Sequence, residues 1–231
     1  LKSGIAMATS PLEHFYSNSA DIKQALEKIQ SAVNKPHRTL IGLTGGPGSG
    51  KSTLAEYITS YFSEHQQQVI SLSMDGFHLS KAQLSELPNP EEAFARRGAP
   101  WTFDSRAFAE RIKSIHQSYQ TKDVLWPSFD HSIGDPIEDD LLISKNAKVI
   151  LVEGLYLLHP QDGWQNAKPL FDEHWFLDIP IEIATKRLAK RHMAAWGFSH
   201  EQAMNRIQQS DGLNAELVLS TKDKANWLIQ N

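Results

Sequence analysis

The chain contains no cysteine among its 231 residues. This absence excludes a disulfide framework and any metal site built on thiolates, and it is compatible with a reducing compartment. The ten histidines show no spacing typical of metal ligands, such as His-Glu-x-x-His. We therefore expect a cytoplasmic protein.

Long apolar runs and an excess of basic residues are also missing. No apolar segment approaches the length that a bilayer-spanning helix needs. The formal net charge is −4, so the chain offers no broad positive field to nucleic acid or to an anionic membrane. Hydrophobic residues make up 40% of the chain and charged residues 22%, which is typical of a globular protein with a core. We expect neither nucleic acid nor a membrane as a partner.

Short apolar segments alternate with amphipathic ones along the chain. The apolar segments predict strands at 38–44, 69–73, 124–125, 148–152, 175–178 and 226–229. Helical spacing of apolar residues predicts helices at 21–33, 52–64, 104–119, 181–195 and 199–209, with short helical pieces and loops over 79–103. This alternation favours an α/β fold, a three-layer α/β/α sandwich with a mainly parallel sheet.

We expect one domain over residues 21–231, opened by a helix at 21–34. Residues 1–20 are interpreted as a tag or a flexible N-terminus, because the first ten, LKSGIAMATS, lack the basic and apolar regions of a signal peptide. A helical lid is expected at about 184–200, where Gly197 follows a charged helix.

The segment GLTGGPGSGKST at 42–53 fits the pattern G-x-x-x-x-G-K-[ST]. Its glycines allow a tight turn with inward-pointing N–H groups, and the positive end of the following helix faces the same point. The lysine can reach the β- and γ-phosphates and the serine hydroxyl can ligate Mg²⁺. A glycine-rich turn without a ligand is the alternative. The predicted ATP-binding residues are Gly45, Gly46, Pro47, Gly48, Ser49, Gly50, Lys51, Ser52 and Thr53.

Other signatures narrow the class of phosphate-binding protein. The guanine-reading Asn-Lys-x-Asp of GTPases is absent, and so is Asp-x-x-Gly. A motor or transporter subunit would usually be larger or carry a second signature. A small-molecule kinase needs a metal-binding carboxylate, a base for the acceptor hydroxyl, mobile cations and a substrate pocket. Each of these has a candidate in the chain.

Two acidic residues follow predicted strands. Glu153 ends the run VILV, and Asp75 follows the strand at 69–73. The carboxyl ends of parallel strands line the ligand crevice of an α/β sheet. Glu153 is therefore a candidate for holding Mg²⁺ together with Ser52, and Asp75 for the catalytic base. A strand-capping role for Glu153 and a turn role for Asp75 are the alternatives.

Cations and pocket residues complete the set. Arg187 and Arg191 lie four residues apart on one helical face, where they can reach the transferred phosphoryl group with Lys51. A solvated charged face is the alternative. Candidate substrate-binding residues follow from polar or aromatic side chains near these positions, although each could be structural: His78, Arg97, Phe129, His131 and Tyr156.

The ordered motifs GGPGSGKST, SMDGFH, PSFDHS, VILVEGLYLL and RLAKRH resemble those of the phosphoribulokinase/uridine kinase family, which includes bacterial-type pantothenate kinase. The resemblance spans about residue 38 to the C-terminus. It implies that Asp75 is the base, that Glu153 is associated with the metal, and that Arg187 and Arg191 are lid arginines. It also implies that PSFDHS belongs to the acceptor-binding segment.

RRGAPWTFD and DHSIGDP are most similar to a subgroup of bacterial and fungal members, some labelled fructose-transport kinases. That subgroup usually reads EGNY, whereas Leu155 stands here in place of the asparagine. A contact from that position is not expected to be kept.

These features predict a kinase that uses ATP and Mg²⁺ to phosphorylate a hydroxyl group of a sugar, a nucleoside or a pantothenate-like molecule. The alternative is a nucleotide-binding regulatory or interaction module with little or no kinase activity. A P-loop nuclease or nucleic-acid ATPase is disfavoured by the acidic balance of charge. A homodimer is a further expectation, since the N-terminal helix lies outside the minimal kinase core.

Overall fold

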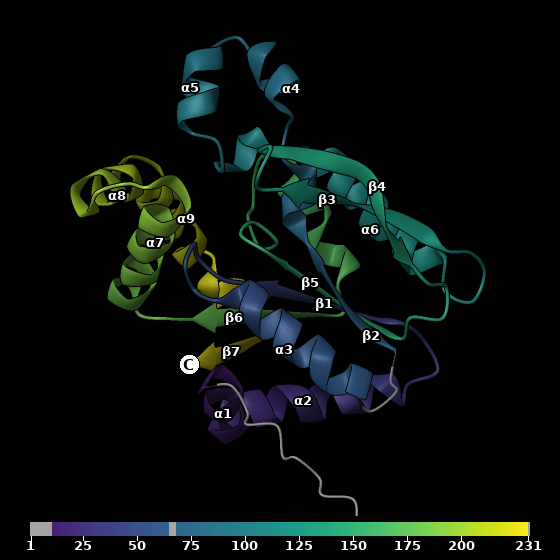
Figure 1. Cartoon of the computed structure of the whole chain (residues 1–231). Helices are drawn as coiled ribbons and strands as arrows, with labels where there is room; N and C mark the ends of the chain where they lie inside the picture. Colours follow the sequence, from purple (N-terminus) through teal and green to yellow (C-terminus); the bar gives the residue numbers. More distant parts are fainter. Residues whose placement is uncertain (1–10, 65–67, 231) are drawn as a thin grey trace, which may run out of the picture.

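The computed structural model describes residues 11–64 and 68–230. Its α-helices are α1 (Pro11–Asn18), α2 (Ala20–Val33), α3 (Lys51–Glu64), α4 (Lys81–Ser85), α5 (Pro90–Ala95), α6 (Ser105–Gln117), α7 (Ile181–Trp196), α8 (His200–Arg206) and α9 (Gly212–Leu219). Its strands are β1 (Thr39–Thr44), β2 (Val69–Ser73), β3 (Val124–Asp130), β4 (Asp135–Ile143), β5 (Val149–Gly154), β6 (Glu173–Asp178) and β7 (Trp227–Gln230). Figure 1 shows their arrangement.

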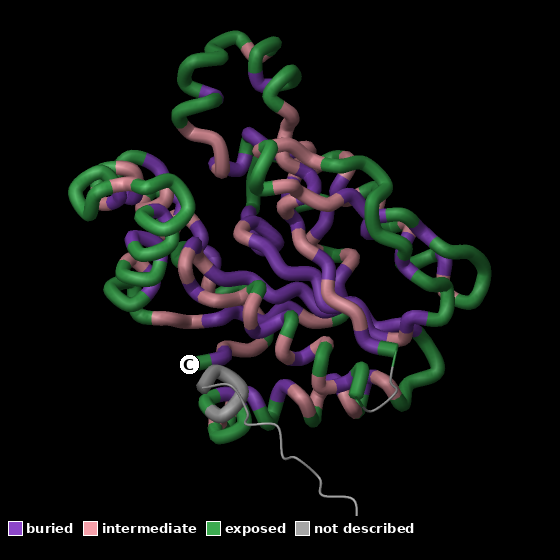
Figure 2. Tube along the Cα trace, viewed as in Figure 1, coloured by how far each residue is buried: buried purple, intermediate pink, exposed green. Residues whose placement is uncertain are grey.

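The central sheet has five strands in the order β2-β5-β1-β6-β7. Each neighbouring pair within it runs parallel. Strands β1 and β5 are buried along their whole length (Figure 2), as expected for central strands covered on both faces. The predicted α/β fold with a mainly parallel sheet flanked by helices is confirmed.

The two faces of the sheet carry separate hydrophobic clusters, because successive side chains of a strand point to opposite sides. Ile41 and Leu43 of β1 pack in the cluster that α2 and α3 cover, with Ile29 and Phe62. Leu40 packs in the opposite cluster, which α6 covers. Figure 1 shows α2 and α3 on one side of the sheet and α6 on the other. The predicted three layers follow from this alternation.

A second sheet was not predicted. Strand β3 runs to Asp130, beyond the predicted 124–125, and pairs antiparallel with β4. In β4 only the last residue, Ile143, is buried. A mostly exposed strand gives no alternating apolar signal, so its sequence does not reveal it. Beside this hairpin, α4 and α5 form a small projecting pair (Figure 1).

The ends of the domain also differ from expectation. Residues 11–18, predicted to be flexible, form α1, whose Tyr16 packs on Tyr57 of α3 with ring centroids 4.9 Å apart. Residues 1–10 of the predicted flexible segment lie outside the described residues. The helix predicted to end at Gln209 instead continues through a π-helical turn, Ile207–Asp211, into α9. Among the described residues, no helix has the length and apolar character required to cross a bilayer.

Candidate active site

Strand register brings three predicted site elements together. Glu153 of β5 lies opposite Leu43 of β1 on one side and opposite Ser73 of β2 on the other. The phosphate-binding loop begins directly after β1, and Asp75 lies in the 3-10 turn Met74–Phe77 directly after β2. The loop and both acidic residues therefore meet at the carboxyl edge of the sheet, where α/β folds bind ligands.

The glycine loop has the backbone expected of an anion cradle. Gly48 and Gly50 have φ values of 76° and 90°, which favour glycine. A Cβ atom on Gly48 would lie 2.4 Å from the carbonyl oxygen of Ala184 in α7. Helix α3 begins at Lys51, so its N-terminal N–H groups face the loop. The loop is thus shaped both for a phosphate group and for close contact with α7.

Ser52 and Glu153 form a direct contact in this cradle. The Ser52 hydroxyl donates a hydrogen bond of 3.2 Å to Glu153 Oε1. Glu153 is buried, and burial raises the pKa of its carboxyl group. The nearby Asp75 carboxylate raises this pKa further, whereas Lys51 lowers it. A buried carboxylate is costly when ionised, so this oxygen pair suits a bound cation.

Helix α7 closes over the phosphate loop. Arg187 Nη1 donates a hydrogen bond of 3.0 Å to the carbonyl oxygen of Ser49. A cavity of about 210 Å³ lies between the helix and the loop, and Arg187 and Arg191 line it together with Lys51, Ser52 and Thr53. The predicted lid arginines and P-loop residues therefore line one cavity.

A second cavity, of about 310 Å³, adjoins the first one. Lys51, Ser52 and Arg191 line both cavities. The second cavity is also lined by Asp75 and by four of the five predicted substrate-binding residues, His78, Arg97, Phe129 and His131. Leu155, which stands where the similar subgroup has asparagine, lines it too. Shared lining residues thus join the cavity at the glycine loop to a mixed polar and aromatic one.

His78 lies between two aromatic rings. Its ring centroid is 4.0 Å from that of Phe103 and 4.5 Å from that of Phe129. Its Nδ1 atom lies 2.8 Å from the carbonyl oxygen of Asp75, which can only accept a hydrogen bond, so Nδ1 carries the proton. Burial lowers the pKa of His78, and the Asp75 carboxylate opposes that shift in part. His78 therefore forms a neutral, fixed part of the cavity wall.

Arg97 lines the cavity, but its donors are largely committed to the protein. They reach the carbonyl oxygens of Gly134 and Leu79 and the Asp135 carboxylate. Its guanidinium also lies 5.4 Å from the ring centroid of Phe129. Arg97 thus ties the loop after α5 to the β3–β4 hairpin and holds Phe129 in place.

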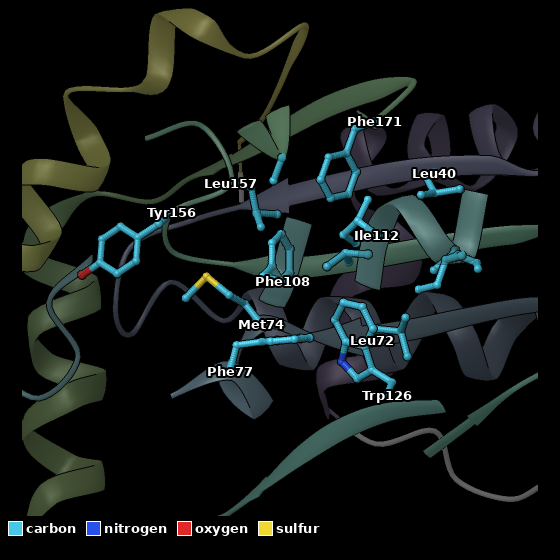
Figure 3. Close-up of a cluster of buried hydrophobic side chains, with 14 of the residues drawn as sticks. Leu40, Leu72, Met74, Phe77, Phe108, Ile112, Trp126, Tyr156, Leu157 and Phe171 are labelled. Carbon is cyan, nitrogen blue, oxygen red and sulfur yellow. The ribbon is translucent and has the colours of Figure 1, made fainter. Parts of the chain in front are cut away.

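Tyr156 does not belong to the lining of this cavity. It is buried in the hydrophobic cluster on the α6 side of the sheet (Figure 3), and its hydroxyl donates to the carbonyl oxygen of Gly98. Burial raises the pKa of this hydroxyl, so it stays protonated. The structure gives Tyr156 a packing role, in contrast to the predicted contact with substrate.

Sequence reasoning missed the wall that the C-terminal helices contribute. His192, Trp196, Arg206, Asp211 and Asn214 line the second cavity. His192 directly follows Arg191 in the motif RLAKRH, so its position in the sequence could have indicated that it lies near the site. Asp211 has no such signal, because its position depends on the π-helical turn that precedes α9.

The curated proteins that resemble this chain in sequence include two that are named as a kinase or a kinase-like protein. A Schizosaccharomyces pombe protein with the name "Putative uridine kinase C227.14" is 38% identical over 185 residues, covering 78% of each chain. The "ATP-dependent kinase-like protein notR'" of Aspergillus versicolor is 40% identical over 153 residues, or 64% of this chain and 88% of that one.

Solved structures with a similar fold are also described as kinases. The crystal structure described as a "putative fructose transport system kinase" from Silicibacter sp. TM1040 superposes with a TM-score of 0.79 at 28% identity, covering 89% of this chain and 97% of that one. Saccharomyces cerevisiae YFH7, at 22% identity, has the same fold with a TM-score of 0.77 and coverage of 95% and 99%. The family model described as "Phosphoribulokinase / Uridine kinase family" matches residues 40–231. The chain is a P-loop kinase that belongs to this family.

Proposed function

We propose that the protein transfers the γ-phosphoryl group of ATP to a hydroxyl group of a small molecule. The observation that carries this proposal is the junction of the two cavities at Lys51, Ser52 and Arg191. A phosphoryl donor in the first cavity and an alcohol in the second would meet there. Membership of the family supports phosphoryl transfer. The proposal adds that the acceptor is a hydroxyl group of a small molecule.

The first cavity is suited to the triphosphate of ATP. The main-chain N–H groups of Gly48 and Gly50 and those at the N-terminus of α3 are suited to bind its oxygens, whereas Pro47 has no N–H group and that of Ser49 donates to the Gly46 carbonyl oxygen. Lys51, Arg187 and Arg191 carry the positive charge that offsets the charge on the transferred group. Because α7 contacts the loop, these cations are in place before the reaction and need little rearrangement.

The donor set also fits Mg²⁺. The Ser52 hydroxyl and the Glu153 carboxylate lie in hydrogen-bond contact and would hold the ion. Mg²⁺ commonly binds one or two carboxylates together with phosphate oxygens and water, so a single buried carboxylate is sufficient. When bound, the ion neutralises negative charge on the phosphates.

Asp75 is the base in this proposal. It lines the acceptor cavity, and Ser73 Oγ fixes its backbone by accepting a hydrogen bond of 3.2 Å from its N–H group. The acceptor oxygen forms a bond to the γ-phosphorus as the bond to the β,γ-bridging oxygen breaks. The hydroxyl proton passes to the Asp75 carboxylate, and ADP leaves.

Measurement of ADP release tests the proposal, with fructose, ribose, uridine, D-glycerate and pantothenate as candidate acceptors. Asp75→Asn should reduce turnover of the true acceptor by about 10²–10⁴-fold while ATP still raises the melting temperature. Asp223→Asn, at an exposed position, is the matched control. ATP binding without phosphorylation of any compound would favour a regulatory module, and an active Asp75→Asn variant would exclude Asp75 as the base.

A further inference from the structure

The helical run after the lid contains an unusual turn. Residues Ile207–Asp211 form a π-helical turn between α8 and α9. Such turns insert one residue into a helix, carry an energetic cost, and occur frequently at functional sites. Ile207 packs with Leu188 of α7, whereas Asp211 lines the acceptor cavity. The turn therefore places a carboxylate in the part of the cavity wall that the C-terminal helices contribute.

His192 holds that carboxylate in place. His192 Nε2 lies 2.8 Å from Asp211 Oδ2, and it donates the proton because an ionised carboxylate can only accept. His192 is 3% exposed and stacks on Trp196, with ring centroids 4.5 Å apart and an interplanar angle of 13°. Within residues 11–64 and 68–230, this is the only hydrogen bond to the Asp211 carboxylate. Its second oxygen remains available to a ligand.

The charges of the cavity indicate what that ligand is. Two of its four cationic side chains, Lys51 and Arg191, are shared with the phosphate cavity. Arg97 donates to Gly134, Leu79 and Asp135, as described above, and Arg206 Nη1 donates to the carbonyl oxygen of Ala95.

Two carboxylates, Asp75 and Asp211, therefore face the acceptor, and among the described residues neither forms an ion pair with a lysine or an arginine. Carboxylates accept hydrogen bonds from hydroxyl groups and repel anions. These properties favour an uncharged acceptor with several hydroxyl groups over a carboxylate or a phosphate ester.

We propose that Asp211, positioned by His192, binds a second hydroxyl group of the acceptor, remote from the one that is phosphorylated, and that the acceptor is an uncharged polyol such as a sugar or a nucleoside. Asp211 then determines specificity, Asp75 acts on the reacting hydroxyl, and His192 is a positioning residue. This inference rests on the proposed kinase function and adds the substrate class and the group that recognises it.

The first experiment needs no variant. The wild-type protein is assayed with the uncharged compounds fructose, ribose and uridine, and with the carboxylates D-glycerate and pantothenate. We expect turnover of an uncharged compound. One monodeoxy analogue of that compound, altered away from the phosphorylated hydroxyl, should lose about tenfold or more in kcat/KM, as expected for a lost hydrogen bond to a charged group. Turnover confined to carboxylates would overturn the inference and leave the kinase function standing.

The second experiment assigns the effect to Asp211. Asp211→Asn should raise the KM for the uncharged acceptor by about tenfold or more and leave the KM for ATP within about twofold. It should also abolish the discrimination against the deoxy analogue. Asp223→Asn, the same change at an exposed position, should leave both KM values unchanged. Melting curves confirm that each variant is folded.

The third experiment tests the positioning role of His192. His192→Gln keeps a hydrogen-bond donor and should retain an acceptor KM closer to wild type than His192→Leu does. If the wild type is active and Asp211→Asn leaves the KM for the acceptor unchanged, the role of Asp211 is wrong and the kinase proposal still stands. No turnover of any compound by the wild type would overturn the kinase proposal together with it.

Discussion

Arg187 Nη1 donates a hydrogen bond of 3.0 Å to the carbonyl oxygen of Ser49, which joins α7 to the glycine loop. The same guanidinium lines the cavity in which the triphosphate is proposed to bind. A single side chain thus links the contact between α7 and the loop with the position of the positive charge.

Replacement of Arg187 should therefore weaken the use of ATP. We expect Arg187→Gln to lower kcat/KM for ATP by about 10–100-fold, the range for a lost hydrogen bond to a charged group. Arg187→Lys should restore only part of this loss, because a lysine cannot form a planar fork between the loop and a phosphate. Steady-state kinetics at varied ATP would show this. Lys190→Gln, on an exposed position of the same helix, is the control. Full rescue by Arg187→Lys would mean that charge alone matters.

Gly48 should be intolerant of a side chain. Its φ of 76° disfavours other residues, and a Cβ atom would lie 2.4 Å from the Ala184 carbonyl oxygen and 2.8 Å from Leu188 Cγ. A left-handed backbone conformation costs about 1–2 kcal/mol, so Gly48→Ala should lower the melting temperature by about 2–8 °C. It should also weaken ATP binding as α7 moves away.

Gly46→Ala is the stability control for this change, since a Cβ atom there would meet nothing within 4 Å. Thermal melts of the ligand-free protein separate the two variants. Equal melting temperatures for both would show that α7 does not pack on the loop as the structure has it.

The fold and the phosphate site were predictable from sequence because their signals are local. Strands β1 and β5 are continuous apolar runs, and the glycine loop has a fixed pattern of residue types. The positions of Asp75 and Glu153 followed from one rule, that the carboxyl ends of parallel strands share an edge. Asp75 lines the cavity of the proposed reaction site. Glu153 accepts a hydrogen bond from Ser52, which lines the same cavity.

The acceptor side was less predictable because it depends on contacts between distant segments. Strand β4 is largely exposed and carries no periodic apolar pattern. Arg97 resembles a free cation in the sequence, but it is committed to the carbonyl oxygens of Leu79 and Gly134. Asp211 enters the cavity through a π-helical turn, a feature that no residue pattern in this chain indicates.

His78 should make the stability of the protein sensitive to acid. Burial lowers its pKa in the folded state, and the Asp75 carboxylate offsets part of this shift. The unfolded chain therefore binds a proton more readily. Above the unfolded pKa of about 6.5, His78 is neutral in both states and does not affect stability. Below that pH the unfolded chain takes up the proton first, so the free energy of unfolding falls as the pH drops toward the lower, folded pKa.

A comparison of wild type with His78→Gln isolates this effect. At pH 8 the variant should be less stable, because it loses the ring contacts with Phe103 and Phe129. At pH 5.5 the difference in the free energy of unfolding should narrow, since glutamine does not titrate. Chemical denaturation at both pH values measures the two differences. A gap that widens in acid would contradict the assignment of a lowered pKa to His78.

Arg38 should be essential for stability although it lies outside the active site. It is 2% exposed and donates to the carbonyl oxygens of Ala147, Ile115, Ser144 and Lys145 and to Ser118 Oγ. Arg38→Met removes every donor and leaves buried carbonyl groups unpaired, so we expect a loss of about 3 kcal/mol or more. Urea denaturation would measure it. Arg106→Met, at a side chain that is 89% exposed, should change stability by less than about 0.5 kcal/mol.

The separate β3–β4 sheet has a consequence for how the protein can diverge. Phe129 lies on β3, and His131 lies in the turn that follows it, whereas the phosphate loop, Asp75 and Glu153 depend on the five-stranded sheet. The two sheets share no strand, and although Trp126 Nε1 of β3 donates to the Ser73 carbonyl oxygen of β2, the far end of the hairpin around His131 can change in length or side chains without shifting the register of the five-stranded sheet. Under the proposed kinase function, selection can therefore change which alcohol fits while the transfer chemistry is kept.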